Sequence, residues 1–224
     1  MGSAAHPTWK HVHASPPAAQ SRHAQDVGAD QDRRRSPDRS TPTVWLGSTG
    51  VRIGLDVSQQ QLEWPEIGRR ARLADDLGFD GIWLFDHFKT MYGESGGPCF
   101  EAWTSLAALA AITERARLGI LITGMTYRHP SVLASEAVTV DHVSGGRLEL
   151  SLGAAWFEEE HRELGIEFPP TGERVSRFEE YVQVVHLLLT EDDVSFDGRW
   201  HRLDRATYRP RPVQQPHPPI WIGA

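Results

Sequence analysis

The sequence predicts an α/β fold in which a parallel sheet is covered by helices. From residue 44 onward, short apolar segments alternate with amphipathic segments, and strand-like segments recur at intervals of about 30 residues. Strands that are buried on both faces are almost continuously apolar, and parallel strands need a crossover helix between them. Both features are present here.

The first part of the pattern contains three strands and two helices. Short apolar runs predict the strands, at residues 52–55, 81–85 and 118–122. A helix is expected at residues 66–77, since it places one apolar set toward one face and ends at Gly78; this set is Ile67, Ala71, Leu73, Ala74 and Leu77. The segment SLAALAA predicts an apolar helix at residues 102–112.

The second part continues the alternation. Helices are expected at residues 131–143, 157–165 and 173–190, and strands at residues 148–152 and 220–222. The first of these helices ends at Ser144-Gly145-Gly146, because glycine is the preferred residue after a helix end. Between the last helix and the last strand, Asp197-Gly198 within residues 194–203 indicates a β-hairpin.

Two architectures fit five parallel strands, an open doubly wound sheet and a closed (β/α)₈ barrel. No Gly-x-Gly-x-x-Gly motif follows the first strand, which removes support for a dinucleotide-binding sheet. A complete barrel needs about 250 residues, whereas the patterned part is residues 44–224. We therefore expect a (β/α)₈ barrel of the TIM type that stops after its fifth strand.

Composition separates a tail from this domain and excludes several classes of protein. Residues 1–43 are rich in Ala, Ser, Pro, Asp and Arg without apolar periodicity, so we expect a disordered tail. No apolar run approaches the ~18 residues of a membrane span. A net charge of −7 argues against nucleic-acid binding, and the single cysteine, Cys99, excludes a disulfide framework and favours the cytoplasm.

Candidate chemistry is expected where the strands end, because reactive residues of parallel α/β folds lie beyond the carboxyl ends of strands. Asp86-His87 follows the second strand and is the one obvious acid/base pair; an imidazole with an ordinary pKa of about 6.5 exchanges protons near neutrality. A structural role for this pair is the alternative. Glycines at 124, 153 and 223 would leave one rim free of side chains, as a flat ring requires.

Two other features carry less information. Glu158 and His161 have the helical spacing of metal ligands, but the surrounding EEEHRE segment indicates a solvated helix face, and no metal site is expected. Trp156, just beyond the fourth strand, is interpreted as a wall of the substrate pocket, with helix packing as the alternative.

Longer segments resemble a known family. The stretch from Tyr127 (YRHPSVLASEAVTVDHVSGGRLELSLGAAW), the following FEEEHRELGIEFPPTGERVSRFEEYV and the final PRPVQQPHPPIWIGA are similar to the luciferase-like monooxygenases. They are most similar to the subgroup of coenzyme F420-dependent oxidoreductases. The resemblance implies a (β/α)₈ barrel and, as cofactor, coenzyme F420, a deazaflavin that accepts or donates a hydride.

The resemblance also implies roles for particular residues. Asp86 would contact the deazaflavin and His87 would be the acid/base, while Glu159 and the backbone of Gly223 and Ala224 would lie near the cofactor. A non-prolyl cis peptide bond is expected at Gly124–Met125, behind the ring. Relatives that oxidise sugar phosphates carry Glu at the position of Trp156, so the resemblance implies a different, more apolar substrate.

The expected function is therefore hydride transfer between coenzyme F420 and a small organic substrate. Two alternatives stay open, an FMN-dependent monooxygenase that uses molecular oxygen and a non-catalytic barrel fragment. The expected partners are a small-molecule substrate and, as an open alternative, a second copy of the chain. Neither nucleic acid nor a membrane is expected.

Overall fold

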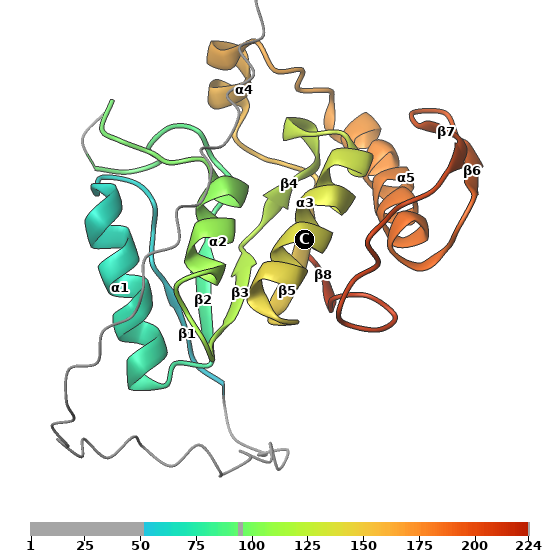
Figure 1. The fold of residues 1–224 in the computed structure, drawn as a ribbon. Coiled ribbons are helices and arrows are strands. Elements are labelled where there is room, and N and C mark those ends of the chain that lie inside the picture. Colours follow the sequence, from blue (N-terminus) through green and yellow to red (C-terminus); the bar gives the residue numbers. More distant parts are fainter. Residues whose placement is uncertain (1–51, 94–95, 224) are drawn as a thin grey trace, which may run out of the picture. The chain divides into compact units, whose positions relative to one another are not determined.

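The computed structural model describes residues 52–93 and 96–223, so the predicted tail at residues 1–43 lies outside the described residues. Helices and strands alternate along this part of the chain (Figure 1). In order they are β1 (Gly54–Asp56), α1 (Trp64–Leu77), β2 (Gly81–Leu84), α2 (Ala102–Ala110), β3 (Arg117–Ile120), β4 (Thr123–Gly124), the 3₁₀ helix η1 (Met125–Tyr127), α3 (Pro130–Ser144), β5 (Leu148–Gly153), α4 (Glu158–Leu164), α5 (Thr171–Thr190), β6 (Val194–Asp197), β7 (Arg202–Ala206) and β8 (Ile220–Ile222).

The five predicted parallel strands are confirmed, and they lie side by side in chain order. β1 pairs with β2, β2 with β3, β3 with β5, and β5 with β8, all in parallel. The third predicted strand is divided into β3 and β4, which both pair with β5. A cis peptide bond joins Leu121 and Ile122 in this gap, so the expected position at Gly124–Met125 is wrong by three residues.

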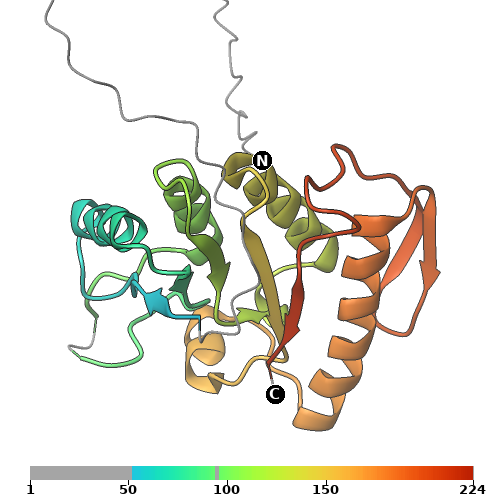
Figure 2. The ribbon, with the colours of Figure 1, turned by 90° about the horizontal axis from the view of Figure 1, so that it is seen from below.

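Helices cover one face of the curved sheet (Figure 2). Strand side chains that point to this face are aliphatic and fully buried, among them Ile82, Leu118 and Leu150. They belong to one core with residues of the covering helices such as Leu106 of α2 and Leu133 of α3. Burial of these apolar surfaces is the main force that holds the helices on the sheet.

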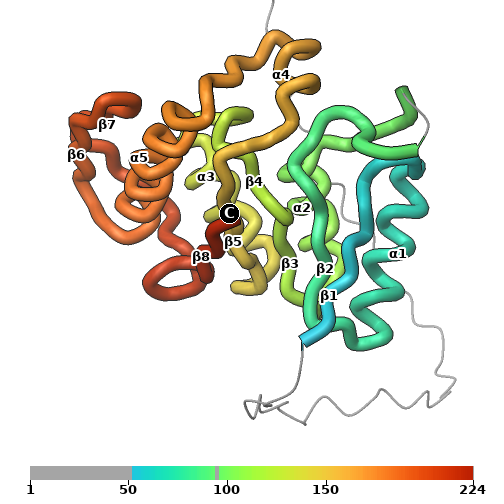
Figure 3. The backbone as a smooth tube through the Cα atoms, turned by 180° about the vertical axis from the view of Figure 1, so that it is seen from behind, coloured from blue at the N-terminus to red at the C-terminus, as the bar shows by residue number. Residues whose placement is uncertain are grey.

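Figure 3 shows the backbone from behind. The face of the sheet opposite the helices has different side chains. Trp83, Arg117, Glu149 and Trp221 line a cavity of about 280 Å³ there. Arg117 forms an ion pair with Glu149, whose second oxygen accepts a hydrogen bond of 2.7 Å from the indole of Trp221. Alternating strand residues of a (β/α)₈ barrel fill its interior in this way, so this face corresponds to the inside of a barrel.

Helix ends agree with the glycine pattern, whereas helix faces agree in part. Gly78 and Gly145 follow α1 and α3 with φ of 82° and 67°, as predicted. In α1, Ile67, Ala71 and Ala74 are buried, but Leu73 and Leu77 are exposed. Among the described residues, no helix has both the length and the apolar character that crossing a bilayer requires.

The predicted hairpin is formed by β6 and β7, which pair antiparallel. Its connection is longer than an Asp-Gly turn, since residues 198–201 lie between the two strands. Glu180 of α5 accepts hydrogen bonds from the backbone N–H groups of Arg199, Trp200 and His201, and so fixes this loop. A tertiary contact therefore sets the turn, in place of the local Asp-Gly geometry.

Candidate active site

The strand ends bring the predicted residues to one edge of the sheet. Asp86 and His87 follow β2, Gly124 ends β4, and Gly153 ends β5. Gly124 and Gly153 are partners in the β4–β5 register. The N–H of Gly223 donates to the Leu152 carbonyl over 2.9 Å, so the third glycine is also at this edge. These residues lie at one rim, as the sequence predicts.

This rim has apolar side chains but few of them. Leu121 and Ile122 are exposed large hydrophobic residues. A Cβ atom added to Gly223 would lie 2.1 Å from Cδ1 of Ile122, and one added to Gly153 would lie 3.3 Å from its Cγ2. The side chain of Ile122 therefore occupies the space over these two glycines, so this part of the rim is not free of side chains as expected.

Asp86 is buried and its carboxylate is fully engaged. One oxygen accepts the N–H of Gly124 over 2.8 Å, and the guanidinium of Arg128 donates to both oxygens over 2.5 and 2.9 Å. Burial alone would lower the pKa of Arg128, but its contacts with Asp86 raise the pKa above its usual value. The Asp86–Arg128 pair thus holds the end of β4 against the end of β2.

Arg128 also lies near two further carboxylates. Its Nη2 lies 3.4 Å from Glu101, the N-cap of α2, and its Nε lies 3.3 Å from Glu136 of α3. Burial is the largest influence on Glu136; it outweighs Arg128 and, with the neighbouring carboxylates, raises the pKa of Glu136 to about 7. Three acids therefore share one cation in this cluster.

His87 is 8% exposed and lies among aromatic rings. The ring centroids of Phe85, Trp156 and Phe157 are 5.9, 5.5 and 5.6 Å from the imidazole centroid. Its Nδ1 lies 3.0 Å from a carboxylate oxygen of Glu160. Within the described part of the chain, the hydrogen bonds to the imidazole all involve Nδ1, so Nε2 is left for a ligand.

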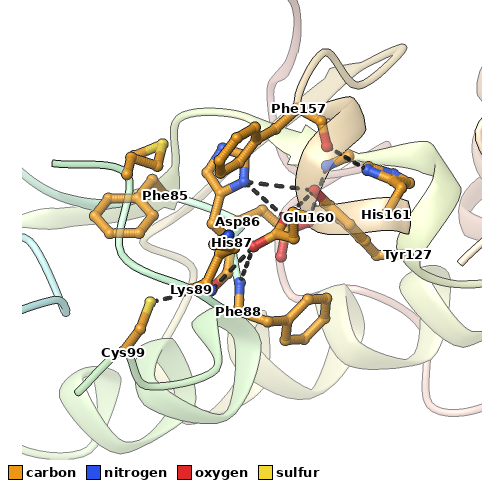
Figure 4. Close-up of polar contacts among 12 residues, drawn as sticks. Phe85, Asp86, His87, Phe88, Lys89, Cys99, Tyr127, Phe157, Glu160 and His161 are labelled. Carbon is orange, nitrogen blue, oxygen red and sulfur yellow. Dashed lines mark hydrogen bonds and ion pairs between the residues drawn. The ribbon is translucent and has the colours of Figure 1, made fainter. Parts of the chain in front are cut away.

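Glu160 is the centre of the polar contacts around His87 (Figure 4). Its Oε1 accepts the N–H groups of Phe88 and Lys89 over 2.7 and 3.0 Å, while Oε2 accepts from His87 Nδ1 and from the Tyr127 hydroxyl. Burial would raise the pKa of Glu160, but these hydrogen bonds outweigh it and lower the pKa to about 2. The carboxylate is therefore ionised at neutral pH.

Helix α4 corrects the expectation that EEEHRE is a solvated face. Glu158 and Glu159 are exposed, but Glu160 and His161 are both 0% exposed. His161 lies between the Phe157 carbonyl (2.7 Å from Nδ1) and the Thr126 hydroxyl (2.6 Å from Nε2), and its ring stacks on Tyr127. Residues 157, 160 and 161 have i, i+3, i+4 spacing, the signal that could have predicted this buried face.

The remaining predicted residues occupy different surroundings. Trp156 is 65% exposed and stacks on Phe157, the N-cap of α4, at 5.0 Å between ring centroids. Glu159 forms an ion pair with Lys89 at 3.1 Å, and Met125 is buried in the core. Ala224 lies outside the described residues. Sequence reasoning did not find Glu160, Tyr127 or Arg128.

Comparisons with known proteins place this geometry in context. The family model described as luciferase-like monooxygenase matches residues 44–224. An F420-dependent glucose-6-phosphate dehydrogenase of Nakamurella multipartita is 34% identical over 176 residues, which cover 78% of this chain and 50% of that protein. An FMNH₂-dependent dimethylsulfone monooxygenase of Pseudomonas putida is 31% identical over 181 residues, covering 80% of this chain and 49% of that protein.

A solved structure agrees with these relatives. The structure of an F420-dependent secondary alcohol dehydrogenase, in complex with an F420–acetone adduct, superposes with a TM-score of 0.69 and 25% sequence identity. The match covers 76% of this chain and 51% of that one. The chain thus spans about half the length of the curated relatives it matches.

Proposed function

The chain belongs to the luciferase-like monooxygenase family, and on that premise we propose that it forms the site of a coenzyme F420-dependent oxidoreductase. The substrate would be a small organic molecule that exchanges a hydride with the deazaflavin. The observation that carries the proposal is the rim at which His87, the three glycines and Trp156 lie together. The F420-dependent relative and the F420-dependent structural neighbour support it.

The residues of the rim fit a flat, largely apolar ring system. Leu121 and Ile122 offer exposed apolar side chains, with Ile122 lying over Gly153 and Gly223 and the Tyr127 ring lying over Gly124. Such a surface can contact a deazaflavin through dispersion. We propose that the cofactor is held by Gly124, Met125, Glu159, Gly223 and Ala224. Asp86 fixes the end of β4 by accepting the N–H of Gly124.

Coenzyme F420, when bound, supplies hydride transfer. The protein must then handle the proton that accompanies the hydride, because a substrate such as an alcohol loses both when it is oxidised. We assign this proton to Nε2 of His87, since Nδ1 is already bonded to Glu160. The imidazole lies among aromatic rings and is 8% exposed.

Trp156 supports a substrate that is more apolar than a sugar phosphate. Its indole is exposed beside His87, at 5.5 Å between ring centroids, and offers no carboxylate. An aromatic wall favours apolar groups of a substrate. The glucose-6-phosphate activity named for the Nakamurella relative is therefore not carried over to this chain.

An FMN-dependent monooxygenase is the second candidate. The observation in its favour is the FMNH₂-dependent relative from Pseudomonas putida, whose identity with this chain is nearly as high. A flat ring of either cofactor would suit the same apolar rim.

Titration of the chain with F420 and, separately, with FMN tests the proposal. We expect tighter binding of F420, measured by the change in cofactor fluorescence and by isothermal calorimetry. Tighter binding of FMN, with oxygen consumption during turnover, would favour the second candidate. Binding of neither cofactor would contradict both candidates for this chain.

A further inference from the structure

The carboxylate of Glu160 is held in one orientation by four hydrogen bonds from two parts of the chain, residues 87–89 and Tyr127. Its Oε1 accepts hydrogen bonds from the backbone N–H groups of Phe88 and Lys89. Its Oε2 accepts hydrogen bonds from the Tyr127 hydroxyl and from Nδ1 of His87. The side chain is fully buried. A buried carboxylate with this many donors has a single stable position, so its contact with the imidazole is fixed.

An ionised carboxylate only accepts hydrogen bonds, and this decides the tautomer of His87. Nδ1 must carry the hydrogen that bonds to Glu160 Oε2 over 3.0 Å. In the neutral imidazole the lone pair then lies on Nε2, the atom without a partner among the described residues. The opposite tautomer would place two lone pairs against each other.

Tyr127, the last residue of η1, stabilises this arrangement. Its hydroxyl has one hydrogen, which it donates to Glu160, and its ring stacks on His161 at 4.7 Å between centroids. Both nitrogens of His161 have partners, on Phe157 and Thr126, so the ring under Tyr127 is also fixed. Glu160 and His161 are consecutive residues of α4, and they orient the side chains of His87 and Tyr127.

We propose that Glu160 is a positioning residue that holds His87 in the Nδ1–H tautomer and so makes Nε2 the proton-accepting atom. The proposal rests on the proposed function for its catalytic meaning, because Glu160 acts on a proton only through His87. The tautomer itself is a property of the protein without cofactor or substrate. It can therefore be tested separately from the choice between F420 and FMN.

The substitution Glu160→Gln has a definite expected effect. The Oε1 position faces two N–H donors, which require an oxygen there. The amide NH₂ group is then placed at the Oε2 position, against Nδ1, to which it can only donate. Nδ1 must become the acceptor, so the hydrogen moves to Nε2. Tyr127→Phe removes the hydroxyl but leaves the Glu160–His87 contact, so the original tautomer should persist.

Histidine ¹⁵N NMR spectra measure the tautomer directly. The unmodified chain, labelled with ¹⁵N-histidine and recorded at pH 8, should give a His87 Nε2 signal in the pyridine-type region and Nδ1 in the pyrrole-type region. The His87 signals are identified by their absence in His87→Ala. Glu160→Gln should exchange the two assignments, whereas Tyr127→Phe and the exposed control Glu158→Gln should keep them.

The unmodified chain alone can overturn the proposal. A pyrrole-type Nε2 signal, or averaging between tautomers, would contradict it whether or not Glu160→Gln folds. An unchanged tautomer in folded Glu160→Gln would also contradict it. Weak binding of F420 with the expected tautomer pattern would instead refute the proposed cofactor and leave the role of Glu160 intact.

Discussion

At the scale of single residues, the two nitrogens of His87 have separate tasks. Nδ1 is bound to Glu160, whereas Nε2 is available to a ligand. Hydride and proton leave an oxidised substrate as separate particles, and a deazaflavin takes only the hydride. In the proposed function an imidazole is suited to the proton, because this group both accepts and releases protons near neutrality.

His87→Ala should therefore lower turnover by roughly 10²–10⁴-fold, the usual contribution of a positioned proton-transfer group. Affinity for the cofactor should change far less, because the exposed apolar side chains of Leu121 and Ile122 are retained. Steady-state kinetics and cofactor titration measure the two effects. His142→Ala, at an exposed histidine of α3, is the control that should retain turnover. Unchanged turnover in His87→Ala would assign the proton to another group.

Residue-scale prediction succeeded where a residue follows an apolar strand and failed where partners are distant in sequence. Asp86 and His87 come directly after a buried strand, so their position at the rim was predictable. Glu160 sits in an acidic run whose local pattern indicates solvent. Its partners Phe88 and Lys89 are 72 and 71 residues away, and no local pattern contains them.

At the scale of elements, helix ends depend on glycine with positive φ. Gly78 ends α1 with φ of 82°, and its N–H bonds back to the carbonyls of the last turn. A side chain in this left-handed conformation is strained, although a Cβ atom at Gly78 would meet no other atom within 4 Å. A substitution at Gly78 therefore introduces backbone strain without a steric clash.

Gly78→Ala should lower the free energy of unfolding by about 1 kcal/mol, through backbone strain alone. Gly172→Ala is the matched control, because Gly172 lies in the first turn of α5, has no positive φ and has equally open space. This control should be neutral or stabilising by up to about 1 kcal/mol. Denaturant unfolding of both variants provides the measurement, and equal effects of the two substitutions would contradict the argument.

Element-scale prediction was accurate for the existence of helices and strands and less accurate inside them. Apolar periodicity located α1, α2, α3 and α5, because each must bury one face on the sheet. It placed Leu73 and Leu77 on the buried face of α1, although both are exposed. The division of the third strand into β3 and β4 depends on backbone geometry that the apolar pattern does not encode.

At the scale of the whole molecule, the cluster around Arg128 joins segments that are far apart in sequence. Asp86 follows β2, Glu101 begins α2, Arg128 follows η1 and Glu136 lies in α3. Three carboxylates against one guanidinium leave excess negative charge in a half-buried place. Burial, with this excess charge, raises the pKa of Glu136 and so links its protonation to the stability of the fold.

Stability should therefore depend on the charge state of Glu136. Its pKa is about 7 in the folded chain and about 4.5 when unfolded, so its stabilising protonated form is fully present below pH 4.5 and is lost as pH rises through 7. Glu136→Gln should match the unmodified chain near pH 4.5 and exceed its unfolding free energy by about 1 kcal/mol at pH 8. Unfolding curves across this range test it, with Glu158→Gln as control. A variant less stable at pH 8 would contradict the prediction.

The order of the strands could be predicted from the sequence, because short crossover connections place consecutive parallel strands side by side. The side chains on the face that corresponds to the inside of a barrel could not be predicted from the sequence. Trp83 lies over Gly119, where an added Cβ atom would lie 2.4 Å from the indole, and this match of a large ring to a glycine on the neighbouring strand depends on register. The disorder expected for residues 1–43 stays a prediction.

The contacts of Lys89 offer a route to chemical labelling. Lys10 and Lys89 are the two lysines of the sequence, so an amine-reactive dye has few targets besides the α-amino group. The ammonium of Lys89 lies between Glu159 and Glu163 of α4 and 5.7 Å from the centre of the Phe157 ring. A fluorophore attached there would sit beside the aromatic cluster next to His87. Its emission would report on the surroundings of Phe157 when a ligand enters.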